Sequence, residues 1–189
     1  MDYFLRITTL GFFVLWQVYW LITEKRADQE KPKRQSASRN SHLQRNGLNL
    51  LCVVVLVQVL GVSFLPVNFP SQEVGICLVM LGTALGISAR KTLGTNWAHA
   101  AEYQIKQQQT LVTQGVYKYI RNPIYIGLTL SLVGAELVAK SYLFLVLLVL
   151  GFGASYLQAK REEKILEMHF AKEYRDYKKR SKMLIPFLF

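Results

Sequence analysis

Five long apolar stretches alternate with polar segments along the chain. They cover residues 7–22, 48–65, 74–89, 124–138 and 141–157. Glu136 is the only charged residue within them. A bilayer enforces such a separation, because a charged side chain in the middle of the hydrocarbon costs several kcal/mol. The pattern predicts an all-α polytopic membrane protein with about five transmembrane helices.

The stretches are short for membrane spans, since a helix needs about 20 residues to cross about 30 Å of hydrocarbon. The fourth cannot extend backward through Pro123, and only Ala139 and Lys140 separate it from the fifth. We therefore expect a tight helical hairpin over residues 124–157. The first stretch lacks a small-residue cleavage site after Ile22, so we interpret it as a retained helix rather than a signal peptide.

The charge distribution predicts the topology. The chain has 189 residues, is 51% hydrophobic and carries a formal net charge of +11. Of its 23 Lys and Arg residues, 21 fall in the alternate segments 24–47, 90–123 and 158–189. Because basic connections stay in the cytoplasm, we expect an external N-terminus and a cytoplasmic C-terminus. Topology and anionic lipid explain the basicity, and no nucleic acid partner is required.

We expect two parts. Residues 1–89 would form three transmembrane helices, with a basic, solvated linker over residues 24–47. Residues 90–189 would contain the hairpin and two cytoplasmic segments, 90–123 and 158–189, which mix aromatic, small and charged residues. Any chemistry is expected in these two segments.

The first cytoplasmic segment ends at the predicted start of a helix. Gly115 marks a turn, and Pro123 suits the first helical position, which directs free backbone N–H groups toward a ligand carboxylate. Arg121 can hold a carboxylate through two hydrogen bonds, while Tyr117 and Tyr125 can frame a flat ligand. In an alternative interpretation, Arg121 contacts lipid phosphate and the tyrosines belong to an interfacial aromatic belt.

The second cytoplasmic segment has an aromatic face. Residues at helical spacing form this face: Leu166, Phe170, Tyr174 and Tyr177. We expect a C-terminal amphipathic helix that continues the fifth span and either bends onto the membrane surface or folds over residues 90–123. Glu162 and Glu163 stand near its start, where they could simply pair with Arg161 and Lys164.

Several common site motifs are absent from the sequence. There is no HExxH, CxxC or GxSxG, so metal, thiol and serine mechanisms lack their usual parts and no metal is expected. The glycines at Gly82 and Gly86 lie in an apolar stretch and indicate helix packing rather than a dinucleotide-binding turn. A cofactor would have to be held by the membrane fold itself.

The runs 111–117 and 121–125, followed by Glu162–Glu163, Phe170 and 173–180, resemble the isoprenylcysteine carboxyl methyltransferase family and its phospholipid methyltransferase relatives. The resemblance covers about the last half of the chain, and membrane sterol reductases share a similar C-terminal arrangement. It implies S-adenosylmethionine bound in a cytoplasmic pocket of helices, and a lipid or lipidated acceptor that enters from the bilayer.

Carried over position by position, the resemblance assigns a set of cofactor contacts. They are Glu102, Gln109, Thr110, Leu111, Val112, Tyr117, Asn122, Pro123, Ile124, Tyr125 and Glu162. Arg121 would hold the carboxylate of the cofactor and Glu162 its amine or ribose. The family usually has His at the position of Asn122, and at the position of Gln158 it commonly has an Arg that contacts the acceptor.

The acceptor is expected to be a carboxylate, which needs no general base. Gln158 and Glu136 are candidate acceptor contacts, although Glu136 could equally be a carboxylate that reaches the membrane interface. The alternatives are a phospholipid amine N-methyltransferase, a membrane NADPH-dependent sterol-type reductase and a non-enzymatic scaffold. Such reductases usually have His and a glutamate where this chain has Asn122 and Gly127.

Overall fold

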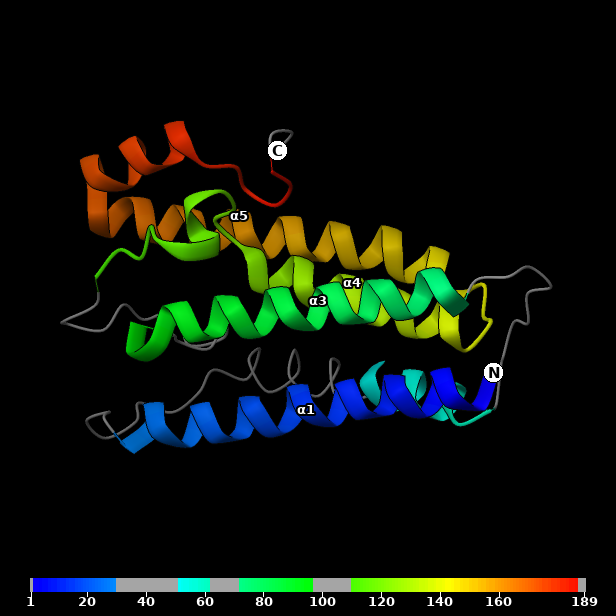
Figure 1. The fold of residues 1–189 in the computed structure, drawn as a ribbon. Coiled ribbons are helices and arrows are strands. Elements are labelled where there is room, and N and C mark those ends of the chain that lie inside the picture. Colours follow the sequence, from blue (N-terminus) through cyan, green and yellow to red (C-terminus); the bar gives the residue numbers. More distant parts are fainter. Residues whose placement is uncertain (1, 30–50, 62–71, 97–109, 187–189) are drawn as a thin grey trace.

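The computed structural model describes residues 2–29, 51–61, 72–96 and 110–186. Its helices are α1 (Asp2–Gln29), α3 (Gln72–Leu93), α4 (Pro123–Val138) and α5 (Leu143–Arg180), with 3-10 turns η1 (Gly94–Asn96) and η2 (Gly115–Lys118). Residues 51–59 are also helical. The long helices run roughly parallel or antiparallel to one another, and α5 covers the side of α3 and α4 opposite α1 (Figure 1).

The described helices have the dimensions and composition of membrane segments. Residues Asp2–Thr23 of α1, the whole of α3 and the helix α5 are long and apolar enough to cross a bilayer, while α4 is apolar but shorter. Large apolar side chains such as Phe4, Leu81 and Val149 are exposed on their outer faces. These exposed faces suit lipid contact, in agreement with the predicted all-α membrane architecture.

The predicted hairpin is present with the expected helix start. Helix α4 begins at Pro123 in the first helical position, and a short turn over residues 139–142 leads into α5. One expectation was wrong: residues 24–29, taken as part of the solvated linker, continue α1 to Gln29. They are mostly Lys, Glu, Arg, Ala and Gln, which are strong helix formers, so the helix extends beyond its apolar part. The rest of the expected linker lies outside the described residues.

Helix α5 reverses direction at Ala171. The backbone there leaves the helical region, with φ of 45° and ψ of −110°. Residues 172–180, here called the return limb, run back over the first part of α5 toward η2 (Figure 1). Of the two courses predicted for this segment, the structure has the one that folds over the first cytoplasmic segment, where it contacts Tyr117 and Arg121. Because alanine rarely takes a positive φ, tertiary contacts of the return limb must hold the reversal.

Glycines bring the backbones of α3 and α4 into direct contact. A Cβ atom on Gly75 would lie 2.6 Å from the carbonyl oxygen of Gly134, and one on Gly82 would lie 2.5 Å from that of Gly127. Such close approach is a common way to associate helices in a membrane, where dispersion replaces the hydrophobic effect as the driving force. Helices α3 and α4 therefore form the tightly packed support for the site.

A buried polar cluster closes the end of the bundle remote from Pro123. Arg6 donates from Nη1 to the carbonyl oxygens of Gln58 and Val59, both at 2.9 Å. The side chain of Gln58 donates from Nε2 to Oε1 of Glu136 at 2.7 Å. Glu136 is only 1% exposed, so it is held inside the bundle rather than extended to the interface. The cluster ties α1, residues 51–59 and α4 together.

The α3–α4 contact predicts a large difference between two glycine substitutions. In Gly82→Ala the new methyl group meets the backbone of α4, so we expect a loss of roughly 1–3 kcal/mol. Thermal unfolding in detergent micelles, followed by circular dichroism, should show a lower midpoint, by about 2–4 °C for each kcal/mol. Gly153→Ala on α5 is the matched control, because a Cβ there meets no atom within 4 Å. Equal midpoints in the two variants would contradict the close contact.

Candidate functional site

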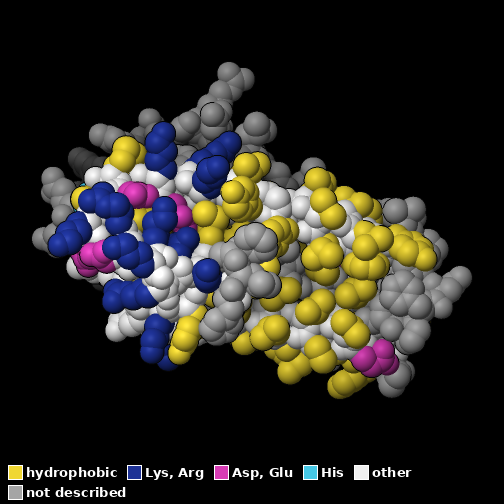
Figure 2. All heavy atoms as spheres, turned by 90° about the horizontal axis from the view of Figure 1, so that it is seen from above, with side chains coloured by type: hydrophobic (Ala, Val, Ile, Leu, Met, Phe, Trp, Pro, Cys, Tyr) yellow, Lys and Arg dark blue, Asp and Glu magenta, His cyan; other side chains and the backbone are white. Residues whose placement is uncertain are grey.

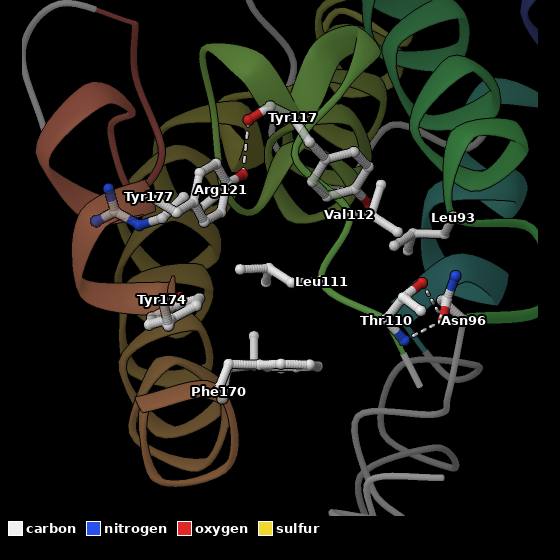
Figure 3. A pocket seen from close by; sticks show the side chains of 11 residues that line it. Leu93, Asn96, Thr110, Leu111, Val112, Tyr117, Arg121, Phe170, Tyr174 and Tyr177 are labelled. Carbon is white, nitrogen blue, oxygen red and sulfur yellow. Dashed lines mark hydrogen bonds between the residues drawn. The ribbon is translucent and has the colours of Figure 1, made fainter. Parts of the chain in front are cut away.

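A cavity lies between the end of α3, the segment that leads into η2, and both limbs of α5. Its empty volume is about 410 Å³. Eleven residues line it: Leu93, Asn96, Thr110, Leu111, Val112, Tyr117, Arg121, Leu166, Phe170, Tyr174 and Tyr177. Figure 3 shows the aromatic side chains of α5 on one side and Leu93, Asn96 and Val112 on the other.

Two local features fix the segment in front of η2. The backbone N–H of Thr110 donates to Oδ1 of Asn96 at 2.9 Å, which holds the segment against η1. Gly115 has a φ of +59°, and a Cβ there would lie 3.0 Å from Oγ1 of Thr92. A glycine is therefore needed at this turn both for its backbone conformation and for the close approach to α3. The predicted turn at Gly115 is confirmed.

Tyrosines join the return limb to η2. The hydroxyl of Tyr177 donates to the backbone oxygen of Tyr117 at 2.6 Å, and the rings of Tyr174 and Tyr177 meet edge to face at 5.9 Å. All three side chains are buried. A tyrosine hydroxyl is neutral at physiological pH, and burial raises the pKa of Tyr117 further, so this hydroxyl can donate a hydrogen bond.

Arg121 stands at the junction of η2 and α4 and faces into the protein. Its Nε atom lies 2.6 Å from Oε1 of Glu163, and both side chains are less than a tenth exposed. Its Nη1 atom donates to the backbone oxygens of Ser181, at 2.5 Å, and Lys178, at 3.4 Å. The side chain of Arg121 is therefore largely enclosed in the cavity wall, and the alternative place at lipid phosphate is not the one observed.

A second polar group lies between α4 and α5, next to the cavity but outside its lining. The hydroxyl of Tyr125 donates to Oε1 of Glu162, and Nε2 of Gln158 donates to the same oxygen at 3.2 Å. One turn deeper, the hydroxyls of Thr129 and Ser155 are 3.1 Å apart. These residues form a polar path along the helix contact, where hydrocarbon would otherwise be expected.

The structure brings part of the predicted cofactor set together. The predicted residues Thr110, Leu111, Val112, Tyr117 and Arg121 line the same cavity. The predicted residues Tyr125, Glu162 and Gln158 form the neighbouring polar group instead. The roles given to both sets stay predictions.

The other predicted residues lie elsewhere. The side-chain amide of Asn122 donates to the backbone oxygen of Met183 at 3.2 Å, so it anchors the C-terminal segment. Pro123 is buried and Ile124 half-buried. Glu136 is in the polar cluster at the other end of α4. Glu102 and Gln109 lie outside the described residues.

Glu163 is the residue that sequence reasoning undervalued. From the sequence it had no predicted site role and could pair with neighbours on its own helix, but it forms an ion pair with Arg121. Its side chain is 5% exposed, which is rare for a glutamate unless it is paired. The aromatic face of α5 was found correctly, since Leu166, Phe170 and the two tyrosines all line the cavity.

Comparison with known proteins places this site in a family. A model of the phospholipid methyltransferase family matches residues 71–173, which include α3, η2, α4 and the first limb of α5. The chain belongs to this family. The matched range contains the cavity wall at Thr110–Val112, Tyr117 and Arg121.

Several curated relatives of this methyltransferase share one name. Protein-S-isoprenylcysteine O-methyltransferase of Mus musculus is 32% identical over 115 residues, covering 60% of this chain and 41% of that protein. The protein of the same name from Dictyostelium discoideum is 32% identical over 122 residues, covering 59% and 50%. That of Saccharomyces cerevisiae is 31% identical over 115 residues, covering 60% and 48%. The chain thus spans between two fifths and one half of the length of these relatives.

A solved structure supports the architecture. The eukaryotic intramembrane Ras methyltransferase, isoprenylcysteine carboxyl methyltransferase, superposes with a TM-score of 0.58 at 27% identity. The match covers 62% of this chain and 43% of the other. The predicted all-α fold of an integral membrane protein is confirmed, as is the resemblance to this group of methyltransferases.

The buried ion pair of the site predicts a marked loss of stability in Glu163→Ala. The substitution leaves the buried guanidinium of Arg121 without its carboxylate, which typically costs 3–5 kcal/mol. Thermal unfolding in detergent should therefore show a strongly lowered midpoint.

Asp176→Ala is the matched control, because it removes a carboxylate from an exposed ion pair. The Asp176 and Lys179 side chains are 51% and 77% exposed, so this loss should be at most about 1 kcal/mol. A similar small effect in both variants would show that the Arg121–Glu163 pair does not hold the site together.

Proposed function

We propose that this protein transfers a methyl group from S-adenosylmethionine to a lipid-borne carboxylate at the cytoplasmic side of a membrane. The observation that carries the proposal is the cavity itself. It collects Arg121, Tyr117 and the backbone of residues 110–112 in one place, within a chain of the phospholipid methyltransferase family. The name of the relatives supports a carboxylate acceptor. The concentration of Lys and Arg in residues 90–123 and 158–189 supports the cytoplasmic side.

The chemistry of the cavity fits the methyl donor. S-adenosylmethionine has an amino acid end, a ribose, a flat adenine and a cationic sulfur. Arg121 offers a guanidinium for the carboxylate, and Asn96 and Thr110 offer polar groups on the opposite wall. The rings of Tyr174 and Phe170 can lie against adenine or near the cationic sulfur. Charged, polar and aromatic groups are thus all present within one cavity.

The residues of the site would act by binding, orientation and exclusion of water. When bound, S-adenosylmethionine supplies a methyl group on positively charged sulfur that a carboxylate oxygen can accept without any transfer of a proton. Arg121 is held in one orientation by Glu163 and Ser181, so it loses little freedom on binding a ligand. The return limb covers the cavity with aromatic side chains, which reduces access of water. Holding two reactants close can supply about 7–11 kcal/mol of the barrier.

The polar path between α4 and α5 is a suitable approach for the acceptor. It includes Gln158 and Glu162 next to the cavity, and Thr129 and Ser155 deeper in the bundle. The neighbouring outer face of α5 is apolar and exposed, as an isoprenyl or acyl chain requires. The described residues that line the cavity include no histidine and no carboxylate, and Glu162 beside it already accepts hydrogen bonds from Tyr125 and Gln158. This composition favours an acceptor that is already ionised.

Cofactor binding can be tested by filling the cavity. Figure 3 shows Leu111 between the α5 wall and the wall formed by Leu93 and Val112. In Leu111→Trp the larger ring occupies this space, so calorimetry with S-adenosylhomocysteine should show little or no binding. Glu162→Gln, which removes a charge but little volume, should weaken binding by about 1.5–3 kcal/mol if the carboxylate contacts the ligand.

Leu145→Trp is the control, because Leu145 is exposed on the apolar face of α5. It should bind the ligand as the unchanged protein does. Unchanged affinity in Leu111→Trp would place the cofactor elsewhere. Binding of NADPH in preference to S-adenosylhomocysteine would favour a reductase.

The acceptor can be distinguished by the stability of the product and by pH. A methyl ester releases methanol in alkali, whereas an N-methyl group does not. A carboxylate is ionised throughout the neutral range, so the rate of its methylation should be nearly constant between about pH 6 and 8. An ammonium must first lose a proton, so its rate should rise with pH.

We expect labelled product from membranes to release volatile methanol in alkali. The rate of methyl transfer should change little between about pH 6 and 8. A phospholipid amine is the second candidate acceptor, because the matching family is described as phospholipid methyltransferase. Label that survives alkali, with a rate that climbs steeply with pH, would establish phospholipid N-methylation instead.

A further inference from the structure

A second hollow is lined in part by Glu163, whose ion-pair partner Arg121 lines the cavity. Three lysines, Lys160, Lys164 and Lys178, stand at its edge, and Met168 and Met183 contribute apolar surface. Its empty volume is about 800 Å³, and it is more open than the cavity. We call it the lysine groove.

The position of the lysine groove matches the depth of lipid headgroups. The exposed apolar surface of α5 includes Val149 and Leu150 and ends at Leu157, less than one helical turn before Lys160. Figure 2 shows hydrophobic side chains gathered over one end of this face and Lys and Arg over the other. Lys160 also lies with its ammonium 5.9 Å from the centre of the Tyr156 ring, an arrangement typical of the membrane interface.

The charge of the groove is not balanced by its own carboxylates. Glu163 is paired with Arg121 at 2.6 Å, and Glu167 is paired with Lys178 at 3.1 Å. Across the residues that the structure describes, Lys160 and Lys164 take part in no ion pair. They are one helical turn apart and exposed, so both ammonium groups can approach one anion.

We propose that the lysine groove binds the phosphate headgroup of an anionic phospholipid. Lys160 and Lys164 contact the phosphate, while the glycerol and the first part of an acyl chain pack against the exposed apolar face of α5 that ends at Tyr156 and Leu157. The apolar surface and the continuity with the lipid-facing side of α5 distinguish this site from one for a free anion. The inference concerns lipid binding alone and does not depend on the proposed methyl transfer.

Native mass spectrometry can test the site on the full chain. The protein is purified in detergent with equal amounts of phosphatidylglycerol and phosphatidylcholine, and the retained lipid is counted. We expect phosphatidylglycerol to be retained in clear preference. Lys160→Gln/Lys164→Gln should lower its affinity on the order of 25-fold, from about fivefold for each lysine. Both side chains are exposed, so the thermal midpoint should not change.

Lys172→Gln/Lys182→Gln is the matched control, because it removes the same charge from exposed lysines outside the groove. It should keep the affinity within about twofold, since these lysines do not contact the headgroup. Equal losses of phosphatidylglycerol affinity in the two double variants would overturn the site, because they would show attraction by the overall positive charge and not by the groove. Equal retention of the two lipids would also overturn it. Displacement of phosphatidylglycerol by an equal concentration of glycerol phosphate would show a free-anion site and not a lipid site.

Discussion

The ion pair between Arg121 and Glu163 holds together the segments that form the cavity. Arg121 belongs to the junction of η2 and α4, Glu163 to the first limb of α5, and the carbonyl of Ser181, which Arg121 also binds, follows the return limb. Two buried charges must be paired, because an isolated charge in a medium of low dielectric constant is strongly unfavourable. The walls of the cavity depend on this contact. The hydrogen bond from Tyr177 to the backbone of Tyr117 is a second link between the return limb and η2.

Features set by local chemistry could be predicted from the sequence. Pro123 fixes the start of α4 because its missing N–H and restricted φ suit the first helical position. The spacing of Leu166, Phe170, Tyr174 and Tyr177 placed them on one side of a helix, and they line one cavity. The separation of charged from apolar residues was sufficient to predict a membrane protein.

Features set by tertiary contacts could not be predicted. Ala171 carries no signal for a chain reversal, because alanine favours helix; bonds formed far away in sequence hold it. Adjacent helical residues point in directions about 100° apart, so Glu162 and Glu163 face different partners, Tyr125 and Arg121. Which of the two glutamates meets Arg121 depends on how α5 lies against α4, and no local pattern contains that information.

The length of α4 sets the depth at which ligands can meet. Its 16 residues span about 24 Å, less than the roughly 30 Å of a hydrocarbon core. The far end is held near the surface by the Lys140–Asp2 ion pair, whose side chains are 36% and 52% exposed. Helix α4 alone is therefore about 6 Å shorter than the hydrocarbon core is thick, before any tilt. A helix end that stops short of the interface is reached by a lipid through lateral diffusion within its leaflet, whereas a water-soluble molecule must descend to it.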